Sequence, residues 1–450
     1  MNRIHFTLQA LLNEEAKLIP GDESYIPFVN LLEKEIENMN KAPKGMYVPI
    51  ITPFREDQSI DFEAFKKVID YFAVPAGETP AGFQVVYSMG SNRELMIDLK
   101  RNINYDRNGK KRPTPFIFSA DSANPYEIEP IKNLIGNLTC NPGIIYDLFI
   151  NDPKENVGNK YKNRDEVMQE IGRILGPGCD ISVELNNPFA PLDEILEEAA
   201  RFKEMLSEYR VVIKVPHTGP VNGKNVHTLI EGNKKFPIAY DQAKTEDYLY
   251  GHNLALALQE NGYRVNYTLM FEPWQTGMAL QAKPYFINSF INKRMMTSTY
   301  VAGMLSAYDT TRDLQFLKNL RSYFIDVDFL PESAAGEDLA KVEKLARETL
   351  TYRDFNNCRG FDGLDGVRHN LRMLKDCSLD DTRLIICSIA GSRQYPELDK
   401  LLVEDEFRDV LDKIVITTEP IYLAQYTASP QIITYQRRFM NAVNNTADKR

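Results

Sequence analysis

One lysine lies inside an uninterrupted apolar run, in the sequence RVVIKVP at positions 210–216. A β-branched run of this kind favours a strand, and burial lowers the pKa of Lys214 because a charged ammonium loses its hydration. A neutral amine is a nucleophile that condenses with a ketone to form a Schiff base. The alternative is a lysine at a strand end whose ammonium group reaches water. The run therefore predicts either a buried, nucleophilic Lys214 or a Lys214 whose ammonium group is solvated.

Two carboxylates belong to other apolar runs. Asp121 ends the run FIFSA at 116–120, and Glu184 lies within ISVEL at 181–185. Carboxylates at the carboxyl ends of barrel strands face the catalytic mouth. A glutamate within a strand is unfavourable unless it is paired or faces a polar cavity. The alternatives are that Asp121 caps the helix expected from about residue 126, and that Glu184 lies on the wet face of an edge strand.

A further run, VNYTLMF at 265–271, carries Asn266 and Thr268 two residues apart. Residues at i and i+2 share one face of a strand. In a barrel both would point inward, where they bind a substrate or each other. The alternative is a polar pair satisfied within the barrel core.

The elements that must position these residues form an alternating pattern from residue 115 onward. Helical patterns separate most of the short apolar runs, and this alternation predicts a parallel (β/α)₈ barrel over 113–450. Two stretches are too long for ordinary connections, at about 222–254 and about 295–361, and we expect the second to be a helical insertion. The expected strands are 116–120, 138–140, 181–185, 211–215, 264–269, 285–288, 384–388 and 413–417.

Residues 1–112 form an expected N-terminal α/β extension. Helical patterns cover 26–39 and 61–72, an apolar run covers 45–54, and the polar stretch DRNGKKRPTP at 106–115 is typical of a loop or linker. The segment from Gly45 locally resembles the first strand and helix of the dihydrodipicolinate synthase group.

The composition excludes several classes of protein. The net charge of −10 argues against broad binding to nucleic acid or to an anionic membrane surface. The five cysteines are widely spaced and the five histidines form no HExxH cluster, so we expect neither a disulfide framework nor a metal site. No run approaches 18 apolar residues, and the N-terminus lacks the pattern of a signal peptide. We therefore expect a cytoplasmic protein without a metal or other cofactor.

Taken together, these stretches resemble the transaldolase and fructose-6-phosphate aldolase family. The resemblance covers roughly 115–430, with two insertions, and the stretches occur in the family's order. They are FIFSADSANPYEIEPIK, LTCNP, SVEL, VVIKVPHTGP, VNYTLMFEPWQTGMAL, INSFINK, CSI and IVITTEPIYLAQY, of which INSFINK matches only partly. No single motif is specific, but their shared order strongly favours the Schiff-base role of Lys214.

The resemblance implies a role for each matched residue. Lys214 forms the imine with C2 of a ketose, and Asp121 takes the proton from the C4 hydroxyl during cleavage. Glu184 acts as general acid and base through a water molecule. The remaining matched residues are Asn141 and Asn266, which hold substrate hydroxyls; Thr268, which places the water; and Phe290, which packs near the lysine.

The sequence departs from the family in the residues that bind the sugar phosphate. Asn288 stands where the family has serine, and Lys293 stands where it has arginine. Ser388 keeps one serine, while the arginine expected two residues later is Ala390, with Arg393 close by. Lysine binds an anion without the bidentate geometry of arginine. The substrate is therefore expected to be a sugar phosphate held in an altered geometry, or a different, non-phosphorylated sugar.

Two other functions remain open. A pyruvate-type Schiff-base lyase is suggested by the N-terminal likeness, although GSNRE at 90–94 fits poorly the turn that this group requires. A non-catalytic barrel that binds sugars or a partner is suggested by the altered anion residues and the unassigned extension. The sequence also leaves open whether the chain forms a homo-oligomer.

Overall fold

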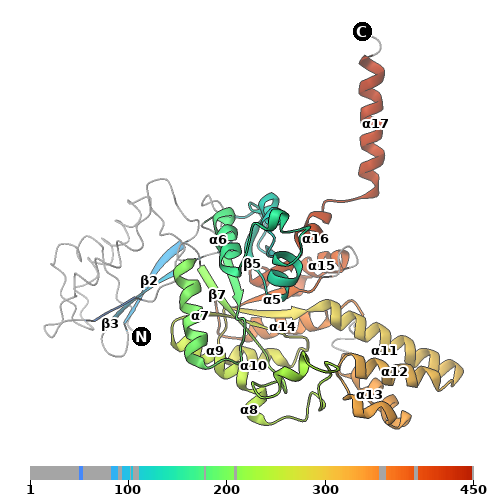
Figure 1. The fold of residues 1–450 in the computed structure, drawn as a ribbon. Coiled ribbons are helices and arrows are strands. Elements are labelled where there is room, and N and C mark those ends of the chain that lie inside the picture. The colour runs from blue at the N-terminus through green and yellow to red at the C-terminus, as the bar shows by residue number, and fades with distance from the viewer. Residues whose placement is uncertain are drawn as a thin grey trace, which may run out of the picture.

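The computed structural model describes residues 50–53, 83–89, 94–101, 103–104, 111–176, 179–206, 210–353, 361–389 and 394–447. Its centre is a closed barrel of parallel strands in the order β10-β11-β4-β5-β6-β7-β8-β9 (Figure 1). The strands are β4 (Ile117–Asp121), β5 (Ile135–Thr139), β6 (Asp180–Glu184), β7 (Arg210–Pro216), β8 (Arg264–Thr268), β9 (Phe286–Phe290), β10 (Arg383–Cys387) and β11 (Ile414–Thr418). All eight expected strands are present, so the predicted (β/α)₈ barrel is confirmed.

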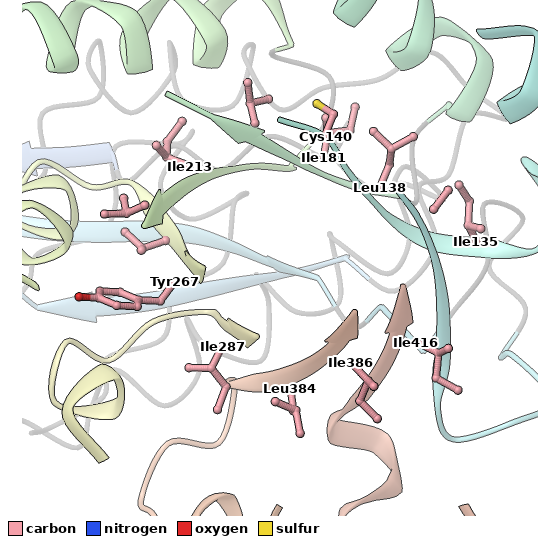
Figure 2. Packing of buried hydrophobic residues seen from close by; sticks show 14 of the residues in the cluster. Ile135, Leu138, Cys140, Ile181, Ile213, Tyr267, Ile287, Leu384, Ile386 and Ile416 are labelled. Atoms are coloured by element: carbon pink, nitrogen blue, oxygen red, sulfur yellow. The ribbon is translucent and has the colours of Figure 1, made fainter. Parts of the chain in front are cut away.

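Alternation along the strands creates two separate apolar cores. One set of side chains points outward against the helices, as Figure 2 shows for Ile181, Ile213 and Leu384. The neighbouring residues point inward, where Val212, Phe286 and others fill the lower part of the barrel. Because successive side chains on a strand face opposite sides, every second residue of each run is available to the interior.

Helices surround the barrel. Those on the strand-to-strand connections are α4 (Pro125–Ile128), α5 (Pro142–Ile145), α6 (Arg164–Leu175), α7 (Leu192–Met205), α8 (Thr245–Tyr248), α9 (Tyr250–Glu260), α10 (Gln275–Gln281), α14 (Asp365–Asp376) and α15 (Tyr395–Leu402). After β11 follow α16 (Pro420–Gln425) and α17 (Pro430–Ala447). The long 222–254 connection contains a 3₁₀ turn, α8 and the start of α9.

The expected helical region between β9 and β10 is present. It consists of α11 (Ile291–Thr311), α12 (Gln315–Asp326) and α13 (Leu339–Thr351), which enclose a small core of their own around Leu320 and Phe324. Buried ion pairs attach this region to the barrel side. The guanidinium of Arg294 binds Asp365 at 2.5 Å, and both Arg294 and Arg353 contact Glu272 in the loop after β8.

Within the expected N-terminal extension, three strands are described: β1 (Ile50–Pro53), β2 (Phe83–Met89) and β3 (Glu94–Arg101), which pair antiparallel in the order β1-β3-β2. β1 lies within the predicted apolar run. The helices expected at 26–39 and 61–72 lie outside the described residues, as does most of the GSNRE segment.

Gly251 allows α9 to pack against the end of β7. A Cβ at this position would overlap the backbone carbonyl oxygen of Pro216, which cannot move without displacing the strand. We expect Gly251→Ala to lower the free energy of unfolding by about 1–3 kcal/mol, as overpacking does. Urea unfolding followed by circular dichroism measures the loss.

Gly303→Ala is the matched control, because Gly303 lies in α11 and a Cβ there meets no atom within 4 Å. Alanine has the higher helix propensity, so this substitution should stabilise the protein by up to about 1 kcal/mol. Equal effects of the two substitutions would contradict the packing argument.

Candidate active site

The strand registers bring the predicted acids and the lysine to the carboxyl end of the barrel interior. In such barrels, alternate strands contribute the side chains of one layer. Carried around the closed barrel, the registers give an upper layer of Asp121, Glu184, Thr268 and Cys387, above a second layer of Thr139, Lys214, Asn288 and Thr417. Polar residues far apart in sequence therefore converge directly below the mouth.

Lys214 is buried inside the barrel, with 6% of its surface exposed. Its Nζ lies 3.0 Å from Oε2 of Glu184, and it donates a hydrogen bond to the carbonyl oxygen of Cys140 at 3.1 Å. Glu184 and Lys214 are register partners on β6 and β7, so their side chains face the same side of the sheet. This pairing excludes a lysine whose ammonium group simply reaches water, and a glutamate on a solvated edge.

The pKa of Lys214 differs from the sequence expectation. Burial alone lowers it, as predicted, but the negative charges of Glu184 and then Asp121 outweigh burial and raise the pKa above its ordinary value. The expectation of a resting neutral amine was wrong because the run RVVIKVP carries no information about which acids lie across the barrel. Lys214 rests as an ammonium, and it needs a proton acceptor before it can act as a nucleophile.

Asp121 interacts electrostatically with Lys214 and Glu184. The hydroxyl of Thr139 donates to its Oδ1 at 3.0 Å. Burial raises the pKa of Asp121, and the charge of Lys214 opposes that rise. The capping alternative for Asp121 is also excluded, since the N-cap of α4 is Asn124, whose side chain accepts the backbone N–H of Tyr126.

Asn266 and Asn288 contact each other inside the barrel. The amide of Asn288 donates to Oδ1 of Asn266 at 2.5 Å and to the carbonyl of Tyr267 at 2.8 Å. Asn288 therefore supports Asn266 from within the barrel. The Nδ2 group of Asn266 is buried and has no partner within the described chain, so it is a donor available to a bound molecule. Thr268 is also buried, at the end of β8.

Asn141 has a structural contact that its sequence pattern did not indicate. It is the N-cap of α5, and its Oδ1 accepts the backbone N–H of Ile144 at 2.9 Å. Its side-chain NH₂ group is then the part left to contact a substrate hydroxyl.

Of the residues predicted to bind an anion, the structure describes some but not all. Ser388 follows β10 with a φ of +56°, and its carbonyl accepts the backbone N–H of Asn292 in the first turn of α11. Lys293, in that same turn, is exposed. Arg393 lies outside the described residues. Phe290 is partly buried, and its ring lies 4.7 Å from that of Phe271.

Sequence reasoning assigned no role to Thr139 or Thr417, although both belong to the layer of Lys214. Thr139 lies two residues before Asn141 in the LTCNP motif, and the hydroxyl that orients Asp121 is visible only once β4 and β5 are paired. Nowhere in the described ranges do three His, Cys, Asp or Glu side chains gather as metal ligands would. The helices described here include none with the length and hydropathy needed to cross a bilayer.

Comparison with known proteins gives one family. Residues 118–324, from β4 to α12, match the family model described as transaldolase/fructose-6-phosphate aldolase. A search of curated proteins gave no match. The matched segment contains β4 to β9 of the closed barrel and the three clustered groups Asp121, Glu184 and Lys214. This match supports the transaldolase/fructose-6-phosphate aldolase family, a family of aldolase and transaldolase enzymes, for the barrel of this chain.

Proposed function

We propose that this protein is a Schiff-base transaldolase or aldolase that transfers or releases a dihydroxyacetone unit. The observation that carries the proposal is the buried Lys214 amine, placed 3.0 Å from Glu184 and within the field of Asp121. An amine next to two carboxyl groups has an acceptor for its proton and a second group for proton transfer at the substrate.

The first step uses Lys214 and Glu184. Substrate entry displaces water, and Glu184 takes a proton from the ammonium through their direct contact. The neutral amine adds to the C2 carbonyl of the ketose to give a carbinolamine. Glu184 returns the proton to the leaving hydroxyl, and water departs as the iminium forms. The remaining carboxylate charge stabilises that cation.

The second step uses Asp121. Its carboxylate removes the proton from the C4 hydroxyl, the C3–C4 bond breaks, and the electron pair moves into the iminium to form an enamine. The aldehyde fragment leaves. The enamine then attacks an acceptor aldehyde in transaldol transfer, or it is protonated and hydrolysed in simple cleavage. The hydrogen bond from the Thr139 hydroxyl orients the Asp121 carboxylate for this proton transfer.

Substrate recognition falls to the surrounding amides and hydroxyls. Asn266 offers a buried donor for a substrate hydroxyl, and Asn141 offers the side-chain NH₂ group that its N-cap contact leaves over. Thr268 places the water of the imine steps. A phosphate tail would meet Lys293, Ser388 and the first turn of α11, with Arg393 as the further cation. Because Lys293 is exposed and binds as a point charge, we expect a phosphate to affect KM more than kcat.

Trapping with borohydride tests the proposal. The protein is incubated separately with fructose 6-phosphate, dihydroxyacetone and pyruvate, reduced, and measured by intact mass with peptide mapping. A dihydroxyacetone-sized adduct on Lys214 is expected. An adduct with pyruvate alone would instead support the lyase alternative, and no adduct with any keto compound would support a binding protein.

Asp121→Asn separates the two steps. The amide keeps the shape of the side chain but does not take a proton, so cleavage of fructose 6-phosphate should fall roughly 10²–10⁴-fold. The imine with dihydroxyacetone needs no C4 proton transfer and should still be trapped on Lys214. If the variant lost the adduct as well, Asp121 would have a role in forming the imine or in holding Lys214.

A further inference from the structure

Aromatic side chains continue outward from the mouth of the barrel. Phe290 ends β9, and its register partner on β10 is Cys387 of the upper layer. The ring of Phe271, in the loop after β8, lies 4.7 Å from that of Phe290. Trp274 follows at the N-cap of α10, and its ring lies 6.5 Å from that of Tyr352 at the C-cap of α13. These rings lead from the candidate active site to the surface.

A buried ion pair fixes the end of α13 beside the loop after β8. Glu272 stands between Phe271 and Trp274 in the sequence, and Arg353 directly follows Tyr352. The guanidinium of Arg353 binds Glu272 at 2.6 Å, and Arg353 itself is buried. The two segments that carry these aromatic rings are therefore held together by a contact below the surface.

A fourth ring comes from the long connection after β7. The ring of Tyr240 lies 5.9 Å from that of Phe329, which follows α12. The pKa of Tyr240 is raised first by partial burial and then by the negative charges of Asp241 and Glu272. The influence of Glu272 places Tyr240 near the same ion pair. We call the following four residues the aromatic strip: Tyr240, Phe271, Trp274 and Tyr352.

All four rings of the aromatic strip are exposed. The exposed fractions are 52% for Tyr240, 38% for Phe271, 56% for Trp274 and 60% for Tyr352. Tryptophan and tyrosine combine an apolar ring face with a polar group that forms hydrogen bonds. The rings of Trp274 and Tyr352 are nearly perpendicular, with an angle of 78° between their planes. One ring can therefore lie against the flat face of a ligand while the other meets its edge.

The charges around the aromatic strip favour a neutral ligand. Arg353 is paired with Glu272 and is not available to an anion, while Asp241 and Glu272 act on Tyr240 and would repel one. A sugar ring fits these surroundings. The C–H groups on its face carry partial positive charge, which the negative face of an aromatic ring attracts, and its hydroxyls can reach the polar groups of tryptophan and tyrosine.

We propose that the aromatic strip binds a neutral sugar ring at the distal end of the substrate whose carbonyl end reacts inside the barrel. The inference rests on the proposed function, since it assigns the class of that substrate: an aldehyde acceptor that carries a glycosyl group, and the ketose made from it. This subsite differs from the predicted anion residues Lys293 and Ser388, which follow β9 and β10, because the strip is built from the connections after β7 and β8 and from the end of α13.

Two acceptors that differ only by a sugar ring test the subsite. With dihydroxyacetone as the donor, addition to glycolaldehyde is compared with addition to glycolaldehyde whose hydroxyl carries a β-glucopyranosyl group. Both faces of this sugar ring present C–H groups. We expect the glucosyl group to raise kcat/KM roughly 5–50-fold in the wild type. Trp274→Ala and Tyr352→Ala should remove most of this gain through KM, and should change kcat/KM for glycolaldehyde by less than about twofold.

Two further variants separate stacking from misfolding. Trp274→Phe keeps an aromatic face and should retain most of the gain from the glucosyl group. Tyr126→Ala is the matched control, because Tyr126 is 47% exposed on α4, which follows β4 on the opposite side of the barrel from β8. This variant should behave as the wild type with both acceptors. An equal loss with both acceptors in Trp274→Ala would mean a structural role for the ring and would overturn the proposal.

Trp274 is the single tryptophan of the chain, so its emission reports binding without turnover. Titration of Lys214→Met with methyl β-glucopyranoside should change this emission saturably, although the variant has no amine to form an imine. Tyr352→Ala in the same background should weaken the response. A dihydroxyacetone adduct in the wild type, with neither an emission change nor a gain from the glucosyl group, would overturn the subsite and leave the proposed function intact. A saturable emission change without any adduct would support the sugar subsite and contradict the Schiff-base function.

Discussion

Lys214→Met should remove the borohydride-trapped adduct and lower turnover roughly a thousandfold or more, because the nucleophile of a covalent mechanism has no substitute. Methionine fills a similar volume without the amine. If the variant still unfolds in one transition with a midpoint near that of the wild type, the loss of turnover is due to the missing amine and not to unfolding. Loss of Lys214 also removes the positive charge that opposes the effect of burial on Asp121, so the pKa of Asp121 should rise further.

Peptide mapping after borohydride trapping with dihydroxyacetone measures the loss of the adduct at position 214. Lys341→Met is the matched control, because the side chain of Lys341 is 74% exposed and its ammonium pairs with Glu337, just before the start of α13. That variant should keep both the adduct and the activity. An adduct of the same mass on another lysine of Lys214→Met, with activity retained, would refute the assignment.

Glu184→Gln should produce two effects with one substitution. The amide cannot accept the proton of the ammonium, so the rate of imine formation should fall roughly 10²–10⁴-fold at neutral pH. The substitution also removes the leading charge that holds the pKa of Lys214 above its ordinary value. Burial, which lowers this pKa, then dominates, and the amine loses its proton at a lower pH than in the wild type.

The pH dependence of trapping separates these effects. With Gln at 184, the trapping rate should remain low, yet its rise with pH should begin at lower pH than for the wild type. Glu197→Gln, on the exposed side of α7, is the control and should change neither the rate nor the profile. A profile that moves to higher pH would mean that Glu184 does not stabilise the ammonium, and would contradict the ion pair.

The raised pKa of Lys214 has a consequence for how this site must work. In the proposed mechanism, an ammonium paired to Glu184 is stable and unreactive, so the nucleophile stays protonated until a substrate enters. On this proposal, substrate binding would allow the proton to transfer over the 3.0 Å between Nζ of Lys214 and Oε2 of Glu184. The ion pair of Lys214 and Glu184 would thus supply both the proton donor and the proton acceptor of the imine steps.

The sequence alone determined where the strands lie and which residues face the barrel interior. Alternation is a local property, and a residue's side of a strand follows from its position within the run. The order of the motifs was also sufficient to predict the family, which the match over residues 118–324 confirms. The roles of individual residues stay predictions until the variants are measured.

The tertiary structure decided everything that depends on distances between strands. Closure of the barrel put Glu184 and Asp121 around Lys214 and so reversed the expected direction of its pKa shift. It also paired Asn288 with Asn266, and gave the side-chain oxygen of Asn141 to a helix N-cap. The physical reason is that strand propensity is read from neighbours in the chain, while electrostatic and hydrogen-bond energies depend on neighbours in space, which only register and closure establish.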